Sequence, residues 1–430
     1  MDLKIMNYCY YSNQSSIEKY NAPVLILFCR DKDKNFHQVY VCDKENLAPE
    51  MYIELGEWDK FYPSWMENKE MYPIVDWANA PDSNYGEETV VLYTTFPWQV
   101  NKLKKMFTHT YMSDLKWEKM CIEKMGLKTP YIEVPDNYKE GWLKVSDIKE
   151  LPEERQFYVH IKWIAWDIET NAAPIFPNFS GYKDAETCDI ISISAYDNYT
   201  KEYHRFFWHE KTSSKEVHTQ WKRKGTMFVP ALNKEKEYDK SNVVITHHFD
   251  NEIDMLKAYF KWFSEIKPDA QMGFNSEGGY RISTRKGSSK KYWFNGYDMP
   301  FLYHRTKTLK ILKEIQKMSP LPNHVKGVKF RVNGEKTSVA IEGVCQIDFI
   351  YTNEIFGYHK KFDKFREGNL QGYMSFFLGF GKVEHKEQIW EMWKDNVKSD
   401  YDPSGPDNGV KKQKNLIKEL FNEAKNETLM

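Results

Sequence analysis

Two carboxylates stand at alternate positions in an otherwise apolar part of the sequence. Asp167 and Glu169 directly follow residues 158–166, an apolar run that fits a buried strand. In an extended backbone, side chains two residues apart project from the same face. Neighbouring carboxylates repel unless a cation lies between them, and hard divalent ions such as Mg²⁺ and Mn²⁺ prefer oxygen ligands. The pair therefore indicates a metal site, with a solvated strand end as the alternative interpretation.

A third carboxylate, Asp298, stands where a helix is expected to begin. Pro300 is tolerated in a first helical turn, and an apolar pattern follows it. Together with Asp167 and Glu169, Asp298 would form a site for two divalent ions. Such a pair of ions activates a water molecule and stabilises the leaving oxygen in phosphodiester hydrolysis. The alternative role of Asp298 is that of a plain helix cap.

These carboxylates lie in segments that resemble the exonuclease motifs of family B DNA polymerases, in particular those of large phages. Trp166-Asp-Ile-Glu-Thr170 is similar to the first motif, and Gly273-Phe-Asn275 with Tyr297-Asp-Met-Pro-Phe301 is similar to the second. Each motif alone is weak, but the combination is specific. The resemblance extends over residues 110–393, and further segments that follow the family pattern are 110–115, 248–256, 267–270 and 341–348.

The resemblance implies 3′→5′ removal of mismatched nucleotides with two Mg²⁺ or Mn²⁺ ions. Asp167 would then ligate both ions, Glu169 one of them, and Asp298 the second, directly or through water. Phe274 and Asn275 would contact the DNA strand or help order the site. The expected partners are single-stranded and primer–template DNA, without sequence specificity, because proofreading reads the backbone and unpaired ends rather than base edges.

The spacing within the second motif departs from the family pattern, because an insertion at about 276–295 separates Asn275 from Asp298. A basic segment with interleaved aromatic residues could follow a phosphate backbone and stack on bases. A solvated surface hairpin is the alternative. The basic residues of the insertion are Arg281, Arg285, Lys286, Lys290 and Lys291, and the aromatic ones are Tyr280, Tyr292 and Trp293.

A hairpin is predicted further along the chain, where residues 328–332 and 337–341 flank a favoured tight turn at Asn333-Gly334. In phage members of the family, a hairpin at this place helps to separate primer from template. Asn333 and Gly334 are therefore expected near DNA. The alternative is an ordinary surface hairpin.

The family's third exonuclease motif, Tyr-x-x-x-Asp, is expected shortly after Trp393, and the sequence does not contain it there. That motif would supply a fourth carboxylate and a tyrosine that positions the attacking water. The palm, fingers and thumb of a polymerase do not follow either. The sequence therefore predicts the N-terminal part of a viral family B polymerase, encoded separately or truncated, that acts in viral DNA replication. A second chain would supply the missing parts, and the apolar stripe Leu416–Ala424 would dock it or pack on its own domain.

Two other functions stay open. The first is a stand-alone 3′→5′ DNA exonuclease, in which Asp189, Asp348 or Asp395 would act as the fourth carboxylate. The second is a non-catalytic scaffold that binds single-stranded DNA. The scaffold predicts DNA binding that does not depend on Asp167 or Glu169 beyond their charge.

The strands and helices expected to position these residues alternate along the chain, which indicates an α/β (α+β) fold. With the resemblance, we expect a ribonuclease-H-like exonuclease domain preceded by a strand-rich domain. Strands are expected near 24–29, 39–42, 90–96, 190–195, 203–207 and 243–246. Helices are expected at 97–106, 116–125 and 251–266, with Asp250 or Asn251 as the cap of the last one. The predicted domains are an N-terminal polymerase domain at 1–155, the exonuclease domain at 156–393, and a loop with an amphipathic helix at 394–430.

Composition limits the remaining possibilities. The 430 residues include 61 Lys and Arg against 62 Asp and Glu, a formal net charge of −1, so DNA contact must come from local basic patches. The six cysteines form no CxxC pair, which favours a reducing compartment over a disulfide framework or a zinc module. The longest apolar run near the start, at 24–29, is too short to cross a bilayer. We expect a cytosolic protein without a membrane partner, in the host cytoplasm if it is viral.

Overall fold

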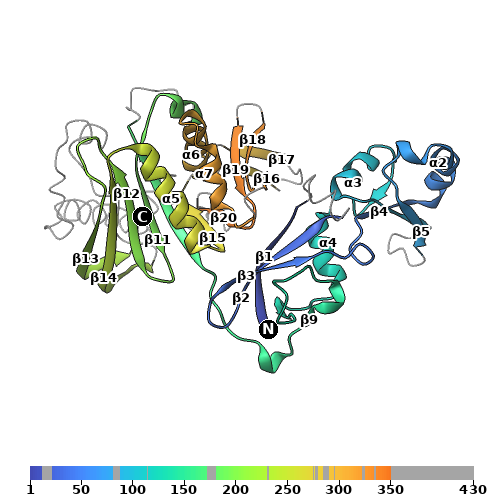
Figure 1. Ribbon diagram of the computed structural model, residues 1–430, viewed down its shortest axis with the longest axis horizontal. Coiled ribbons are helices and arrows are strands. Elements are labelled where there is room, and N and C mark those ends of the chain that lie inside the picture. The colour runs from blue at the N-terminus through green and yellow to red at the C-terminus, as the bar shows by residue number, and fades with distance from the viewer. Residues whose placement is uncertain are drawn as a thin grey trace, which may run out of the picture. The chain divides into compact units, whose positions relative to one another are not determined.

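The computed structural model divides the chain into two compact units, one from Met1 to Ile161 and one that begins at Lys162 (Figure 1). It describes residues 1–349 apart from 12–21, 81–87, 114, 172–180, 230–231, 275, 277–278, 284–289, 295, 322–324 and 334–335. The loop and amphipathic helix predicted at 394–430, the apolar stripe Leu416–Ala424 and Asp395 lie outside the described residues. The limits of the three predicted domains stay a prediction.

The first unit begins with an antiparallel sheet in the order β3-β2-β1-β8-β9. The helix α4 (Trp117–Lys124) packs Trp117, Met120 and Cys121 into the core of this sheet. Every residue of the interior strand β2 is buried, which explains the continuous apolar sequence of residues 24–29. The strands expected near 24–29 and 39–42 are confirmed as β2 and β3, which pair with each other, and the predicted helix at 116–125 is confirmed as α4. The strands are β1 (Asp2–Tyr11), β2 (Val24–Arg30), β3 (Phe36–Val41), β8 (Tyr131–Glu133) and β9 (Lys149–Glu150).

The same unit contains a second antiparallel sheet in the order β5-β6-β4-β7. Along the chain its elements run β-α-β-β-α-β, the split βαβ arrangement. Met51, Ile53, Val90 and Leu92 alternate toward the two helices and form a core with Trp58. The elements are β4 (Glu50–Glu54), α2 (Leu55–Glu67), β5 (Asp76–Ala80), β6 (Thr89–Tyr93), α3 (Pro97–Leu103) and β7 (Thr110–Tyr111).

A seven-stranded mixed sheet in the order β13-β14-β12-β11-β10-β15-β20 forms the second unit. If the five strands β10, β11, β12, β15 and β20 are numbered 1 to 5 along the chain, their order in the sheet is 3-2-1-4-5. Only β11 runs antiparallel to β10. This is the ribonuclease-H-like arrangement. The predicted fold class is therefore confirmed. The strands are β10 (Trp163–Thr170), β11 (Ile190–Asp197), β12 (Glu202–Trp208), β13 (Lys215–Val229), β14 (Lys234–Phe249), β15 (Ala270–Gly273) and β20 (Cys345–Asp348).

One predicted boundary in this sheet is wrong. The strand expected at 158–166 is β10, which begins at Trp163 and continues to Thr170, so Asp167 and Glu169 lie within the strand rather than after it. Two of the large apolar residues before β10 are not buried, since Tyr158 is 75% and Ile161 53% exposed, whereas Val159 between them is 2% exposed. The backbone enters the sheet only at Lys162, whose N–H donates to Asp269 Oδ2 at 2.8 Å.

Helices of the second unit pack on the buried side of β10. The helix α5 (Glu252–Ile266) places Met255, Leu256, Tyr259, Phe260 and Phe263 in one core with Ile164, Trp166 and Ile168. Its predicted start is confirmed, because the Asn251 side chain accepts the Asp254 N–H at 2.9 Å. The predicted helix start at Asp298 is also confirmed by α6 (Asp298–Thr308), which the short α7 (Leu312–Ile315) follows.

Two small hairpins complete the second unit. The insertion after Asn275 forms one of them, with strands β16 (Gly279–Ser283) and β17 (Lys290–Phe294). The other confirms the hairpin expected at 328–341, with strands β18 (Val328–Asn333) and β19 (Lys336–Ile341). Both β16 and β17 contact β19, so the two hairpins are neighbours.

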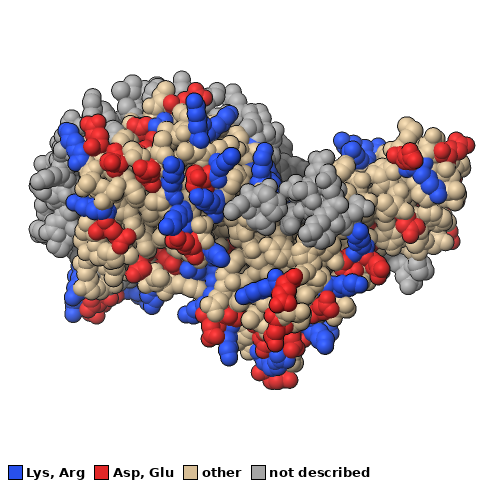
Figure 2. Space-filling view, in the orientation of Figure 1, with Lys and Arg blue, Asp and Glu red and all other residues tan. Residues whose placement is uncertain are grey.

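Charges of both signs are mixed over the face in Figure 2, as the net charge of −1 leads one to expect. Among the described residues, no helix combines the length and the apolar character needed to cross a membrane.

Candidate functional site

The strand β10 separates its side chains into two sets by simple alternation. Ile164, Trp166 and Ile168 are buried, whereas Asp167 and Glu169 are half-buried on the opposite face. The Trp166 ring stacks on Tyr259 of α5, with 6.2 Å between the ring centroids. This packing fixes the rotation of the strand and thereby turns both carboxylates away from the core. The prediction that the pair shares one face is confirmed.

A hydrogen bond joins the end of β10 to the start of α6. The hydroxyls of Thr170 and Tyr297 lie 3.1 Å apart, and Tyr297 immediately precedes Asp298. A β-bulge between Glu169 and Thr170 in the pairing with β11 accompanies this contact. The first-motif strand and the third carboxylate are therefore held to each other across more than a hundred residues of sequence.

A hydrogen bond between backbone groups joins the two ends of the insertion. The carbonyl of Ser276 accepts the N–H of Met299 at 2.8 Å, so the chain leaves for the inserted hairpin and returns at one point. Gly273 ends β15 directly before this turn, and a Cβ at Gly273 would collide with the Cβ and Oγ of Ser276. Only glycine fits there without a shift. The inserted length thus leaves the two halves of the second motif side by side.

Asp298 is 4% exposed and is surrounded by phenols. Burial raises the pKa of Tyr297 to about 12, and the nearby Asp298 carboxylate contributes to that shift. Burial also raises the pKa of Tyr259, again with a contribution from Asp298. Both phenols therefore stay protonated at neutral pH beside the carboxylate.

Asp167, Glu169 and Asp298 offer carboxylate oxygens, which suit Mg²⁺ or Mn²⁺ better than softer ions. The structure places them on two elements whose ends are hydrogen-bonded, which fits a shared cation. It does not bring them into a tight cluster. Within the described ranges, the one group of three candidate ligands whose ligand atoms all lie within 4.8 Å of one another is Glu54, Glu57 and His109, in the first unit. Mutual repulsion of three like charges opposes a closer approach.

Asp189, considered above as a fourth carboxylate, belongs to a buried ion-pair network instead. It accepts hydrogen bonds from Arg305 Nη2 and, at 3.0 Å, from Asn171 Nδ2. Arg305 also binds both oxygens of Glu252, with Nε–Oε1 at 2.9 Å and Nη2–Oε2 at 2.6 Å. Burial raises the pKa of Glu252, while the guanidinium partly offsets that shift. The network fastens α6 to α5 and to the start of β11, where the Ile190 N–H donates to Glu252 at 2.8 Å.

Sequence reasoning missed this network because its members are far apart in the chain. One signal was present, since Arg305 follows Phe301 by four residues and therefore falls on the apolar face of its helix. A charge at such a position requires a buried partner.

Asp348 ends β20 and pairs in register with Gly273 of β15. The neighbouring strand β10 runs parallel to β15, with Ala165 opposite Met272. Carboxyl ends of three adjacent parallel strands thus meet at one edge, and this register places Asp348 opposite Gly273 and Trp166, on the face of the sheet opposite to Asp167. Asp348 is 6% exposed.

The predicted DNA-contacting residues fall on the two hairpins and on one turn. Phe274 is half-buried directly after β15. Arg281, Lys290, Lys291 and Asn333 lie in β16, β17 and β18, but nothing of their side chains is described. Asn275, Arg285, Lys286 and Gly334 lie outside the described residues.

A basic surface that the sequence analysis did not single out runs along α6 and α7. Its exposed members are Lys307, Lys310, Lys313 and Lys317. Figure 2 shows Lys and Arg side chains gathered where Figure 1 shows these helices. Lys317 is paired with Glu314 at 2.5 Å.

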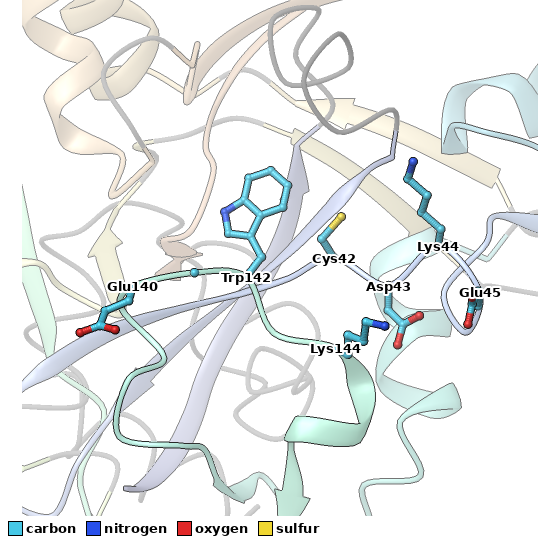
Figure 3. Close-up of a pocket in the computed structure, with 8 residues that line it drawn as sticks. Cys42, Asp43, Lys44, Glu45, Glu140, Trp142 and Lys144 are labelled. Carbon is cyan, nitrogen blue, oxygen red and sulfur yellow. The ribbon is translucent and has the colours of Figure 1, made fainter.

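The first unit contains a hollow of about 540 Å³ that includes none of the predicted site residues. Figure 3 shows Trp142, Cys42 and Lys44 projecting to the same side of the backbone there. Asp43 is committed to local structure, since its carboxylate accepts the N–H groups of Asn46 and Val145.

Comparison with known proteins agrees with this geometry. Residues 136–278 match the family model described as "DNA polymerase family B, exonuclease domain", which includes Asp167, Glu169 and the Gly273 turn. No curated protein matches the sequence. The structure is similar to that of the family B DNA polymerase from the hyperthermophilic archaeon Pyrobaculum calidifontis, with a TM-score of 0.55 and 15% identity. The match covers 92% of this chain and 42% of the archaeal chain, so this chain spans less than half the length of that polymerase.

Proposed function

We propose that this chain, which carries the exonuclease domain of DNA polymerase family B, is the N-terminal part of such a polymerase and removes nucleotides from DNA in the 3′→5′ direction. The observation that carries the proposal is the family match at residues 136–278, which includes the strand that bears Asp167 and Glu169. The hydrogen bond from Thr170 to Tyr297 supports the inclusion of Asp298, which lies beyond the matched residues.

Asp167, Glu169 and Asp298 would hold two Mg²⁺ or Mn²⁺ ions. When bound, such ions make water a stronger nucleophile and stabilise the charge on the leaving oxygen. The protein's own contribution is positioning. The Trp166–Tyr259 stack fixes the strand, and the Ser276–Met299 contact fixes the start of α6. The carboxylates of β10 stay accessible to solvent, as a site that accepts a DNA end requires.

DNA would reach this site along basic and aromatic groups. Phe274 lies beside the Gly273 turn, and the basic insertion forms one of the two adjacent hairpins. The lysines of α6 and α7 provide local positive charge. Contacts of this kind bind single-stranded and primer–template DNA through phosphates and base stacking, so the affinity should fall steeply with salt.

We also propose that a second chain supplies the third exonuclease motif and the polymerase domains, and that the pair acts in viral DNA replication in the host cytoplasm. One observation supports this extension: the match covers 42% of the archaeal polymerase, so that polymerase has further segments that this chain does not match.

A stand-alone exonuclease is the second candidate, with Asp348 as the residue to test as its fourth carboxylate. This buried carboxylate ends the strand two places from β10 at the same edge of the sheet. It shares the sheet face of Trp166, so a site that completes itself would require the Asp348 carboxylate to reach the Asp167 face around the ends of the strands.

Degradation of 5′-labelled single-stranded DNA by the purified chain with Mg²⁺ or Mn²⁺ tests the proposal. An Asp167→Ala/Glu169→Ala variant should lose any activity that the parent has. The matched control is Glu235→Ala/Glu237→Ala, which removes two alternate carboxylates from an exposed part of β14 and should change nothing.

The outcomes separate the candidates. Activity of the chain alone that needs Asp167 and Glu169 would favour the stand-alone enzyme and contradict the second chain; loss with Asp348→Asn as well would identify the fourth carboxylate. Activity that emerges only with a chain beginning with Tyr-x-x-x-Asp would support the two-chain polymerase. DNA binding with no degradation in either setting would contradict the exonuclease and leave a scaffold.

A further inference from the structure

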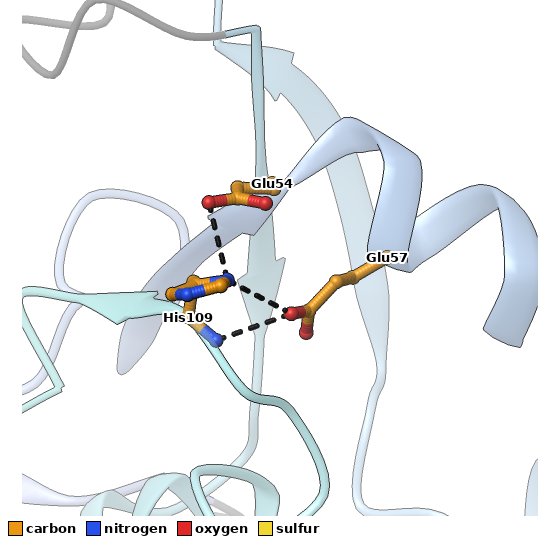
Figure 4. Close-up of side chains that lie close together, drawn as sticks. All are labelled: Glu54, Glu57 and His109. Atoms are coloured by element: carbon orange, nitrogen blue, oxygen red, sulfur yellow. Dashed lines mark hydrogen bonds and ion pairs between the residues drawn. The ribbon is translucent and has the colours of Figure 1, made fainter.

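Three potential metal ligands converge at one corner of the split βαβ sheet in the first unit. His109 Nδ1 lies 3.3 Å from Glu54 Oε1 and 3.3 Å from Glu57 Oε1 (Figure 4). Glu54 ends β4, Glu57 lies in the first turn of α2, and His109 directly precedes β7. Three different elements therefore each contribute one donor atom to one point, with all three atoms within 4.8 Å of one another.

The corner is held in place independently of the imidazole. Glu57 accepts the backbone N–H groups of Thr108 at 2.9 Å and His109 at 3.2 Å. Glu54 Oε1 accepts the Tyr111 hydroxyl at 3.3 Å, and Ile53 pairs with Thr110 across β4 and β7. Both carboxylates are mostly covered, with 24% and 20% of their side chains exposed, whereas His109 is 59% exposed. The site is thus preformed and open to solvent on the imidazole side.

The distances fit a shared cation better than a hydrogen bond. Charge-assisted N–H···O bonds are about 2.7–2.9 Å long, and one Nδ1–H can point well at only one oxygen. Here the same nitrogen stands 3.3 Å from two oxygens. Ligands at about 2.0–2.1 Å around a tetrahedral ion lie roughly 3.3–3.4 Å apart, which matches both distances.

We propose that Glu54, Glu57 and His109 form a binding site for a first-row divalent transition metal, with Zn²⁺ as the expected occupant. A nitrogen and two carboxylate oxygens are a donor set that Zn²⁺ takes readily and that Mg²⁺ avoids. The ion clips the edge strand β7 to the corner between β4 and α2. This site differs in chemistry from the all-oxygen carboxylates of the second unit, and it does not depend on the proposed nuclease function.

Zn²⁺ affinity of the full chain, measured by competition with a chromophoric chelator, tests the site. The parent protein carries Asp167→Ala/Glu169→Ala, so that the carboxylates of the second unit contribute little. His109→Gln and, separately, Glu57→Gln should each lower the affinity by at least about 10–100-fold. Glu57→Gln keeps a side-chain carbonyl that can accept the Thr108 N–H, so it separates loss of a ligand from loss of folding.

The matched control is His218→Gln. His218 is equally exposed, at 59%, and also faces a glutamate, with Nε2–Oε1 of Glu216 at 2.6 Å, but within the described part of the chain it pairs with that one carboxylate only. Its replacement should leave Zn²⁺ affinity unchanged. In the parent, Zn²⁺ should also raise the melting temperature of the first unit, and His109→Gln should abolish that rise while far-UV circular dichroism stays the same. Failure of the parent to bind Zn²⁺, or equal affinity in the parent and His109→Gln, would overturn the proposal.

Discussion

The molecule contains two groups of potential cation ligands, and they differ in how their members are held. Glu54, Glu57 and His109 lie within 4.8 Å of one another, whereas Asp167, Glu169 and Asp298 are tied through the backbone and through Tyr297. In the first group, the N–H groups of Thr108 and His109 and the Tyr111 hydroxyl bind the two carboxylates and hold them at one corner. Three carboxylates repel, so the second group needs rigid elements that hold it together. By the distance between ligand atoms alone, only the first of these two groups would be identified as a metal site.

Neutralising one ligand in each group should have the largest and the most different effects on activity. Asp298→Asn keeps the size of the side chain and removes its charge. If the carboxylates act as proposed, exonuclease activity, measured with whatever chain completes the enzyme, should fall by about 100-fold or more, because metal-centred charge stabilisation is lost. His109→Gln should leave that activity within about twofold. A loss of activity in His109→Gln at unchanged folding would mean that the two groups are coupled.

Removing the network that carries Asp298's helix should have the largest effect on stability. Arg305→Met leaves Glu252 buried without its guanidinium, which costs about 3–5 kcal/mol of unfolding free energy. Denaturant unfolding followed by the fluorescence of the tryptophans measures this. Lys307→Met, on the exposed side of the same helix, is the control and should cost less than about 0.5 kcal/mol. Similar losses in both variants would contradict the role of the network.

A substitution at Gly273 tests whether the tight turn after β15 is needed to position the carboxylates. Gly273→Ala forces the added methyl against the Ser276 side chain and should cost about 1–3 kcal/mol, with lower nuclease activity. Ser276→Gly in the same chain removes the colliding atoms and should recover part of both losses. No rescue in the double variant would mean that the strain lies elsewhere in the turn. Thermal melting and the degradation assay report the two effects separately.

The smallest expected effect is a pH dependence of the second unit. Burial lowers the pKa of both His204 and His247, whose rings stack and whose nitrogens lie 3.3 Å apart. A lowered pKa means that the unfolded chain binds protons more readily, so stability is full above about pH 6.5 and falls as the solution is acidified.

The melting temperature should therefore drop by a few degrees between pH 7.5 and 5.5, and His247→Gln should reduce that slope. Glu216, which accepts from His218 and pairs with His247 at 3.1 Å, opposes the drop without reversing it. An unchanged slope in His247→Gln would place the pH dependence in other groups.

The sequence was informative where the signal is local. The shared face of the Asp-x-Glu pair, the Asn251 cap and the helix start at Asp298 each depend on a few neighbouring residues, and the structure has all three. The shared face is correct although the strand begins at Trp163 rather than at 158, because side-chain alternation does not depend on where a strand begins.

Long-range features could not be read in this way. Glu57 and His109 are 52 residues apart, and only the pairing of β4 with β7 brings them together. The strand β13 is rich in charge and lacks an apolar pattern over much of its length, so it was not predicted at all. Its conformation depends on its partner β14 rather than on its own sequence.

That same strand has a consequence for how the protein behaves in concentrated solution. β13 forms one edge of the seven-stranded sheet, and a long unpaired edge is a template for joining sheets of different molecules. Lys222 and Lys224 are exposed along it, and Lys224 is paired with Asp239 at 3.5 Å. Adding another copy at this edge would bring lysines of two molecules together. The charged residues that make β13 hard to predict from its sequence therefore also protect the sheet against aggregation.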